Sequence, residues 1–261
     1  MITLRAIFQL IRLESSLLAF LAIFLPLLVR SNDLAFSFRK AAPLLFICIC
    51  TFIANDLDDV EKDRVNHPDR PLPAGHLSPV FVVVLYFTSL ALALFSTKYY
   101  IEPNIDFLYY GAISLSISYG YIVEYLPSLK APYVAIVASV PILIVAATYP
   151  NETKLYIVAG SLFLLTLGRE VCMDIKDRDG DPVSFMHRFS PAPLAKVAFF
   201  LQMIGLFLLV SLINKIGDII DFVAMTFLFT LSGVSWFKLE RYKISLILMK
   251  IQLFVGLYFL I

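Results

Sequence analysis

Side chains with hard oxygen donors gather directly after an apolar run over residues 41–53. These donors are Asn55, Asp56, Asp59 and Asp63. On an α-helix, three of them fall at i, i+4 and i+8, and Asp56 comes three positions before Asp59, so one helical face is expected to carry them all. Mg²⁺ prefers such oxygens and usually takes one or two carboxylates from a protein. Because acidic side chains at the edge of a hydrocarbon layer require neutralisation, this spacing predicts a metal site.

A second acidic cluster lies far along the chain and also follows an apolar run, residues 155–167. Asp174, Asp177 and Asp181 stand at i, i+3 and i+7, again on one helical face. Two such clusters at matching membrane depth can hold metal ions between them, and a diphosphate would bridge those ions. A solvated helix end would explain either cluster alone about as well, but the matched pair favours a shared metal site.

Basic side chains accompany both clusters and are candidate phosphate ligands. The loop over residues 64–79 contains four prolines and a glycine, which prevent a continuous helix. Its arginines, Arg64 and Arg70, carry forked N–H donors that match a phosphate group. Lys176 and Arg178 alternate with the acids of the second cluster. The alternative is an ordinary loop whose arginines face water and lipid headgroups; beside a metal site we favour binding of a diphosphate.

Composition restricts the class of protein. Hydrophobic residues make up 60% of the 261 positions and charged residues 16%, which argues against a water-soluble globule. The net charge of +1 gives no electrostatic case for a nucleic-acid partner. The three cysteines lie inside apolar runs without metal-ligand or disulfide spacing, so we interpret them as small buried hydrophobes.

Apolar stretches of near-spanning length recur between short polar breaks, which is typical of an all-α polytopic membrane protein. We expect a single domain over residues 1–261, with nine membrane-spanning helices. The predicted spans are residues 7–29, 41–55, 80–96, 107–123, 133–148, 155–174, 194–212, 219–236 and 244–260. With the amino terminus in the cytoplasm, most basic residues outside the spans fall on the cytoplasmic side. The positive-inside rule therefore places both acidic clusters at the cytoplasmic face.

The two acidic stretches resemble the UbiA superfamily of intramembrane prenyltransferases. That family carries an Asn-Asp-x-x-Asp-x-x-x-Asp motif on its second helix, which Asn55, Asp56, Asp59 and Asp63 reproduce. A second Asp-rich motif follows its sixth helix, and Asp174, Asp177 and Asp181 fill it. The segment from Asp63 to Gly75, with Arg169-Glu170 and Gly180-Asp181, looks most like the branch that includes archaeal digeranylgeranylglyceryl phosphate synthases.

The resemblance implies nine helices around a central cavity with Mg²⁺ at its polar mouth. In that family an allylic diphosphate ionises and an acceptor captures the carbocation. Metal ions and basic side chains stabilise the negative charge of the leaving group, while apolar walls exclude water. Under this interpretation Asp59, Asp177 and Arg70 are catalytic, and tyrosines such as Tyr109, Tyr110, Tyr119 and Tyr121 lie on spans that can offer aromatic faces to a cation.

The sequence departs from the family pattern at three positions. Ser15 stands where the family commonly has an Asn on the first helix, and Glu124 and Ala131 stand where many members have a Lys and an Asn. Lys130 is expected to replace the missing Lys in part, as a further diphosphate ligand. These changes affect the groups that recognise an acceptor more than the groups that ionise a diphosphate.

Three functions are compatible with these features. The leading hypothesis is Mg²⁺-dependent transfer of a polyprenyl group from its diphosphate to a lipophilic or glycerol-phosphate-like acceptor, with membrane lipid around the protein. A membrane terpene cyclase would use the same metal site without an acceptor. A cation- or proton-coupled transporter would use intramembrane acids, but here the acids cluster at one face, not at the midplane.

Overall fold

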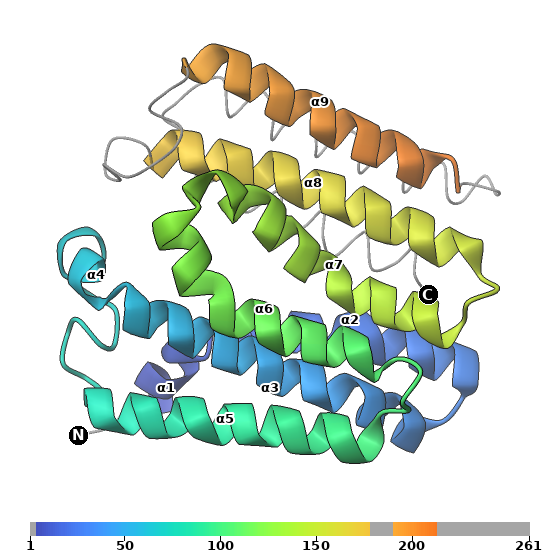
Figure 1. Ribbon diagram of the computed structural model, residues 1–261, viewed down its shortest axis with the longest axis horizontal. Helices are drawn as coiled ribbons and strands as arrows, with labels where there is room; N and C mark the ends of the chain where they lie inside the picture. The colour runs from blue at the N-terminus through green and yellow to red at the C-terminus, as the bar shows by residue number, and fades with distance from the viewer. Residues whose placement is uncertain (1–3, 178–189, 213–261) are drawn as a thin grey trace.

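The computed structural model describes residues 4–177 and 190–212, and this part of the chain is helical throughout apart from its turns and loops (Figure 1). The elements in chain order are α1 (Leu4–Leu10), α2 (Leu13–Ser31), α3 (Leu34–Asp58), α4 (Val60–Asn66), α5 (Pro79–Tyr100), α6 (Asp106–Tyr125), the 3₁₀ turn η1 (Pro127–Leu129), α7 (Lys130–Thr148), α8 (Thr153–Asp177) and α9 (Pro191–Val210).

Within the described residues, six helices are long and apolar enough to cross a membrane: α2, α3, α5, the stretch Pro127–Thr148 that contains α7, α8 and α9. The multi-pass membrane character predicted from the sequence is therefore confirmed. Helix α6 forms where the span 107–123 was predicted but is not among the six, because its serines and tyrosines lower its mean hydropathy. The predicted spans 219–236 and 244–260 lie outside the described residues.

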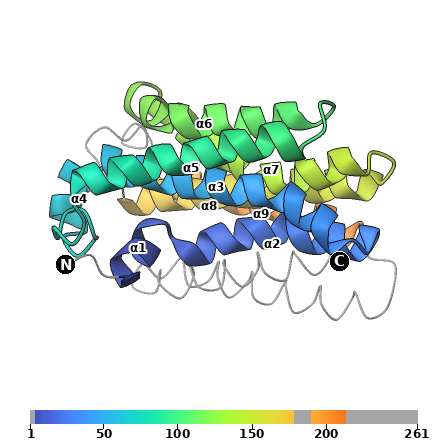
Figure 2. The same cartoon turned by 90° about the horizontal axis from the view of Figure 1, so that it is seen from below.

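Helix α3 is the centre of one half of the bundle, where it packs against α2, α5 and α6. Helix α8 is the centre of the other half and packs between α7 and α9 (Figures 1 and 2). Contacts of α7 with α2 and α6 join the two halves. The largest apolar cluster follows these contacts and includes Ile23 of α2, Ile47 of α3, Ile113 of α6, Ile144 of α7 and Val158 of α8.

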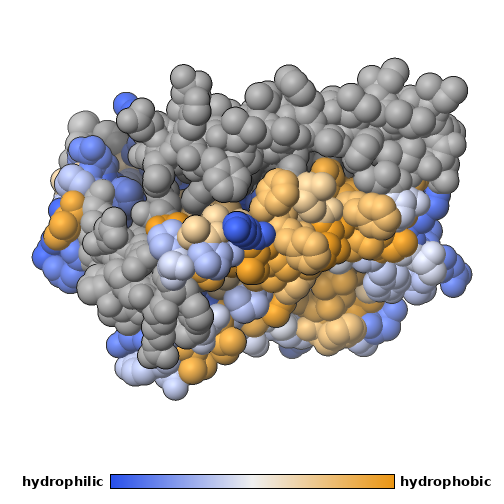
Figure 3. Space-filling view, turned by 90° about the horizontal axis from the view of Figure 1, so that it is seen from above, coloured by the Kyte–Doolittle hydropathy of each residue, from blue (hydrophilic) through white to orange (hydrophobic). Residues whose placement is uncertain are grey.

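Many large apolar side chains point out of the bundle, for example Phe87 and Phe95 of α5 and Phe200 and Phe207 of α9. Seen from above, apolar residues occupy the middle of the molecule and hydrophilic ones gather at its two ends (Figure 3). Such a band between polar ends is the surface that a helical bundle presents to lipid, where every backbone polar group must be paired inside its own helix.

Ion pairs between separate elements hold the end of the bundle where α2 ends and α3 begins. Arg30 at the end of α2 donates to both carboxylate oxygens of Glu152, at 3.0 to 3.1 Å. Lys40, which is only 2% exposed, pairs with Glu102 in the loop between α5 and α6. The Tyr109 hydroxyl donates to the carbonyl oxygen of Lys40 at 2.8 Å. Tyr109 is therefore a packing residue at this end.

The prediction of one helix over residues 7–29 is wrong, because α1 and α2 are separate helices. Arg12 lies between them in the left-handed conformation, with φ 43° and ψ 57°. That conformation is costly for a residue with a Cβ and persists only where surrounding contacts fix it. Here the guanidinium of Arg12 hydrogen-bonds Asp56 and lies over the ring of Phe52, 4.9 Å from its centroid. A contact between distant parts of the chain therefore breaks the helix.

Close packing of α8 against α9 depends on a glycine. A Cβ at Gly168 would come within 2.6 Å of the carbonyl oxygen of Ala198 and of Cγ of Gln202. We expect Gly168→Ala to lower the free energy of unfolding by about 1–3 kcal/mol, because the backbone of α9 must move. Gly160→Ala on the same helix is the matched control, since no described atom lies within 4 Å of its added Cβ. Thermal unfolding in detergent measures both, and equal midpoints would contradict the prediction.

Candidate active site

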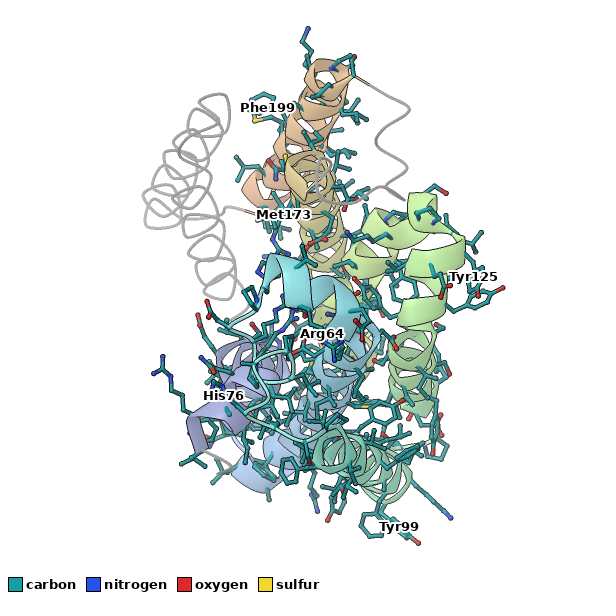
Figure 4. All side chains as sticks on the ribbon, turned by 90° about the vertical axis from the view of Figure 1, so that its left-hand side faces the viewer. Arg64, His76, Tyr99, Tyr125, Met173 and Phe199 are labelled. Carbon is teal, nitrogen blue, oxygen red and sulfur yellow. The ribbon has the colours of Figure 1, made fainter. Side chains whose placement is uncertain are left out.

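The two acidic motifs lie at the same end of the bundle. Helix α3 ends there at Asp58, α4 follows, and α8 arrives there with its carboxyl-terminal turn (Figure 1). Figure 4 looks onto this end, with Arg64 of α4 facing the viewer and Met173 of α8 beyond it. We call this end the mouth.

The spacing predicted that one unbroken helix carries the first motif. This prediction is wrong, because two helices carry it. Helix α3 ends at Asp58, Asp59 adopts φ −93° and ψ 6°, and α4 begins at Val60. Backbone hydrogen bonds still run from Asp59 N–H to the Asn55 carbonyl and from Asp63 N–H to the Asp59 carbonyl, at 3.0 and 2.8 Å. The break therefore alters the direction of the side chains without removing the four-residue spacing.

Two acids of the first motif turn toward arginines, and we call Asp56, Asp63, Arg12 and Arg70 the arginine cluster. Both aspartates are buried, with 5% and 4% exposed. Arg12 Nη2 lies 3.0 Å from Asp56 Oδ1, and Arg70 Nη1 lies 3.6 Å from the same oxygen. Arg70 Nη1 also hydrogen-bonds Asp63 Oδ2. Two carboxylates from either side of the helix break thus converge on one guanidinium nitrogen.

The acid Asp59 belongs with a second group, the lysine cluster of Asp59, Tyr119, Lys130, Glu170 and Asp174. Lys130 Nζ donates to Asp174 Oδ1 at 2.7 Å and links the start of α7 to α8. The hydroxyl of Tyr119 lies within electrostatic range of the other four groups. Glu170 is buried, one turn before Asp174, and accepts from Arg169 at 2.8 Å. Tyr119 of α6 is therefore near acids of both motifs.

A cavity of about 320 Å³ opens beside the arginine cluster. Its walls come from α1, from the break before α2, from α3 and from the loop after α4. The lining residues are Gln9, Arg12, Asp56, His67, Pro68, Asp69, Arg70 and Pro71. All members of the arginine cluster except Asp63 thus face a space that can admit a polar ligand.

The donor chemistry of these clusters fits Mg²⁺. Their acids supply hard carboxylate oxygens, and Asp56 and Asp63 both contact Arg70. Within the described residues, however, no three His, Cys, Asp or Glu side chains come together closely enough to surround an ion. The acids are instead paired with arginine and lysine. A metal bound here would have to replace those partners.

The remaining predicted site residues have varied positions. Asn55 is half-buried on the last turn of α3, and Lys176 and Asp177 lie on the last turn of α8. Arg178 and Asp181 lie outside the described residues. Arg64 is exposed on α4 and pairs with Glu61 at 2.9 Å, one turn earlier on the same helix (Figure 4). Among the residues that the structure describes, the ion pair of Arg64 is with Glu61 and not with another predicted ligand.

The sequence pattern did not identify Arg12, Glu170 or the cavity residues Gln9 and Asp69 as parts of the site. A single arginine inside an otherwise apolar run was the available signal for Arg12, because such a residue in a membrane segment requires a buried partner. Lys130, in contrast, was expected to replace the lysine missing at position 124, and it contacts the second motif. Glu124 itself is exposed.

Comparison with known families agrees with this arrangement. Residues 15–255 match the model of the UbiA prenyltransferase family, which is nearly the whole chain. The chain belongs to that family.

Relatives within the family are archaeal. The UbiA-family chain is 33% identical over 103 residues to a digeranylgeranylglyceryl phosphate synthase of Methanococcus maripaludis, covering 35% of this chain and 36% of that one. It is 25% identical over 190 residues to the synthase of the same name from Methanosphaera stadtmanae, covering 69% and 65%. The matched segments thus span less than two thirds of either relative.

Solved structures share the fold along nearly the full length. A structure described as giving insights into digeranylgeranylglyceryl phosphate synthase in membranes superposes with a TM-score of 0.73 at 20% identity, covering 98% of this UbiA-family chain and 96% of that one. A UbiA homologue from Archaeoglobus fulgidus bound to GPP and Mg²⁺ gives a TM-score of 0.58 at 17% identity, covering 98% and 99%. The all-helical UbiA fold predicted from the sequence is confirmed by these likenesses.

The Lys130–Asp174 pair offers a direct test of the geometry at the mouth. We expect Lys130→Gln and Asp174→Asn each to destabilise the protein, because either change removes the ionic partner of a partly buried charge. The double variant should lose less than the sum of the two, with a coupling of about 0.5–3 kcal/mol. Thermal unfolding of the four proteins in detergent completes the cycle, and strictly additive effects would show that the two side chains do not interact.

Proposed function

We propose that this protein transfers a polyprenyl group from an allylic prenyl diphosphate to an acceptor, with Mg²⁺ at its mouth. The observation that carries the proposal is the meeting of two acidic motifs, each paired with basic side chains, at one end of an apolar helical bundle. Acids and bases in alternation at the edge of a membrane suit a bound metal–diphosphate complex.

Metal ligands in this proposal are Asn55, Asp56, Asp59 and Asp63 of the first motif and Asp174, Asp177 and Asp181 of the second. Bound Mg²⁺ would neutralise negative charge on the diphosphate and so make it a better leaving group. The Archaeoglobus fulgidus homologue, whose structure contains GPP and Mg²⁺ together, supports this assignment.

Basic side chains bind the diphosphate in the proposal. Arg70 and Lys130 pair with different motifs, Arg70 from the loop after α4 and Lys130 from the first turn of α7. A cation beside each motif would hold the diphosphate in place and stabilise the charge that develops as the carbon–oxygen bond breaks. Arg64, Lys176 and Arg178 are further candidates for the outer oxygens.

The prenyl chain would extend from the mouth into the bundle between α3, α6 and α7. Near the mouth, the rings of Tyr119 and Tyr133 lie with centroids 5.8 Å apart, and the Tyr133 hydroxyl is hydrogen-bonded to Ser118 at 3.0 Å. These rings offer faces that stabilise an allylic cation while the apolar walls exclude water. Tyr110 and Tyr121, which the sequence also suggested, are exposed on α6 and are less suited to that role.

An acceptor with a glyceryl phosphate headgroup is the most consistent with the relatives, which are digeranylgeranylglyceryl phosphate synthases. Such an acceptor is itself a lipid and would reach the site from the bilayer. We also propose that the mouth and the amino terminus face the cytoplasm, because the positive-inside rule favours this orientation.

Removal of a motif acid should abolish diphosphate release. We expect Asp59→Ala and Asp177→Ala to lower the rate by about 100-fold or more, since each would remove a metal ligand from the leaving group. Glu61→Ala is a matched control from the same stretch, because Glu61 is exposed and pairs only with Arg64 among the contacts of the described residues. Release of pyrophosphate from geranylgeranyl diphosphate, with a glyceryl phosphate lipid present as acceptor, measures the rate in detergent. Full activity of Asp59→Ala would refute its role.

The acceptor requirement separates the possible reactions. Purified protein with Mg²⁺ and prenyl diphosphates of several lengths should release little pyrophosphate until a glyceryl phosphate lipid is added, because a transferase needs that acceptor to capture the cation. Hydrocarbon or terpene alcohol formed without an acceptor would instead indicate a cyclase. No pyrophosphate release under any condition would reject both enzymes and leave a transporter.

A further inference from the structure

Without a ligand, the buried acids of both motifs are neutralised by basic side chains of the protein itself. Asp56 and Asp63 share Arg70, and Arg12 adds a second contact to Asp56. Asp174 is paired in the same way with Lys130. Each basic partner comes from an element other than the one that carries its acid. Basic side chains of the chain itself thus occupy the positions next to these carboxylates.

A carboxylate oxygen directed at a guanidinium cannot at the same time ligate a metal in the same direction. Mg²⁺ alone would have to displace Arg70 from Asp63, which would leave a half-buried guanidinium beside a divalent cation. A diphosphate alone would approach Asp56 and Asp63 and be repelled by them. When both arrive, the metal takes the carboxylates and the freed guanidinium has phosphate oxygens to bind. Each ligand therefore removes the main obstacle to the other.

We propose that Arg70 is an internal cation that occupies the first metal motif in the ligand-free protein and moves to the diphosphate when Mg²⁺ enters. The inference rests on the proposed function, in which the acids bind Mg²⁺ and the substrate is a diphosphate. It adds that metal and diphosphate bind with positive coupling and that free Mg²⁺ binds weakly. Arg12 stays on Asp56 as its positioning partner, because its left-handed backbone and its contact with Phe52 fix it in place.

The surroundings of Arg70 leave room for this movement. Its side chain is 33% exposed, whereas the two acids that it contacts are 6% exposed. It also lines the cavity of about 320 Å³ at the mouth, together with His67 and Asp69. Arg12 is equally exposed, at 36%, and lines the same cavity, but its guanidinium also lies over the ring of Phe52. We therefore infer that Arg70 is the partner that moves, while the carboxylates on α3 and α4 stay in place.

Binding measurements on the full chain in detergent test the inference without any turnover. Electron paramagnetic resonance titrates Mn²⁺, as a substitute for Mg²⁺, in the absence of phosphate compounds. Calorimetry then titrates a premixed complex of Mg²⁺ with inorganic pyrophosphate. The proteins compared are the wild type, Arg70→Gln, Arg70→Lys and the control Arg5→Gln, which removes the same charge from an exposed position on α1.

The expected signature is a change of opposite sign in the two titrations. Arg70→Gln should bind Mn²⁺ alone about 5- to 100-fold more tightly, because the carboxylates have lost their internal cation. It should bind the Mg²⁺–pyrophosphate complex about tenfold more weakly, because the phosphate has lost a charged donor. Arg70→Lys should stay near the wild type for Mn²⁺ alone, and Arg5→Gln should change neither affinity by more than about twofold.

Other outcomes overturn the inference in distinguishable ways. Weaker binding of both ligands by Arg70→Gln would show that Arg70 only holds the acids in position. Weaker binding of the complex with unchanged Mn²⁺ affinity would make Arg70 a phosphate ligand that does not block the metal. If the wild type binds neither Mn²⁺ nor the complex, the proposed function itself fails. Unfolding midpoints within a few degrees of the wild type establish that the variants are folded.

Discussion

Neutralisation of carboxylates that are buried at helix ends is the constraint on which the mouth of this protein depends. Removing water from a carboxylate is costly unless a cation and hydrogen bonds replace it, and an acid left without its partner destabilises the fold strongly. Asp56, Asp63 and Asp174 are all buried, and each has a basic partner from another element. Those partners come from three separate places: the break between α1 and α2, the loop after α4 and the start of α7.

The two ends of the bundle use similar pairs for different purposes. At the end away from the mouth, Lys40 is almost fully buried and Arg30 binds Glu152 with two nitrogens, so these pairs close the structure. At the mouth, Arg70 is a third exposed and borders a cavity. A guanidinium beside open space can exchange one anion for another, whereas a lysine enclosed by protein cannot. The two ends of the bundle therefore differ in how exposed their basic side chains are.

The sequence predicted the helices well because lipid-facing and core-facing residues are both apolar, so spans appear as long uninterrupted runs. It predicted their limits less well: the span 41–55 is part of α3, which begins earlier at Leu34 because Asp33 accepts from the Phe36 N–H and caps the helix. The breaks at Arg12 and Asp59 carry no glycine or proline. The break at Arg12 accompanies an ion pair with Asp56, 44 positions along the chain, which spacing along one helix cannot reveal. For the same reason the acids were predictable and Arg12 was not.

The position of Lys130 explains one departure from the family pattern, the glutamate at position 124. Glu124, where many members have a lysine, is exposed, and the cation instead reaches Asp174 from Lys130 on the first turn of α7. The charge needed beside the second motif is therefore retained, although its position in the sequence has shifted. No such replacement accompanies Ala131, which is buried and has no polar side-chain atom. The basic side chain beside the second motif is thus kept while an amide is lost next to it. Under the proposed transfer reaction, this difference would affect the acceptor more than the diphosphate, and the side chains around Ala131 and Tyr133 would select that acceptor.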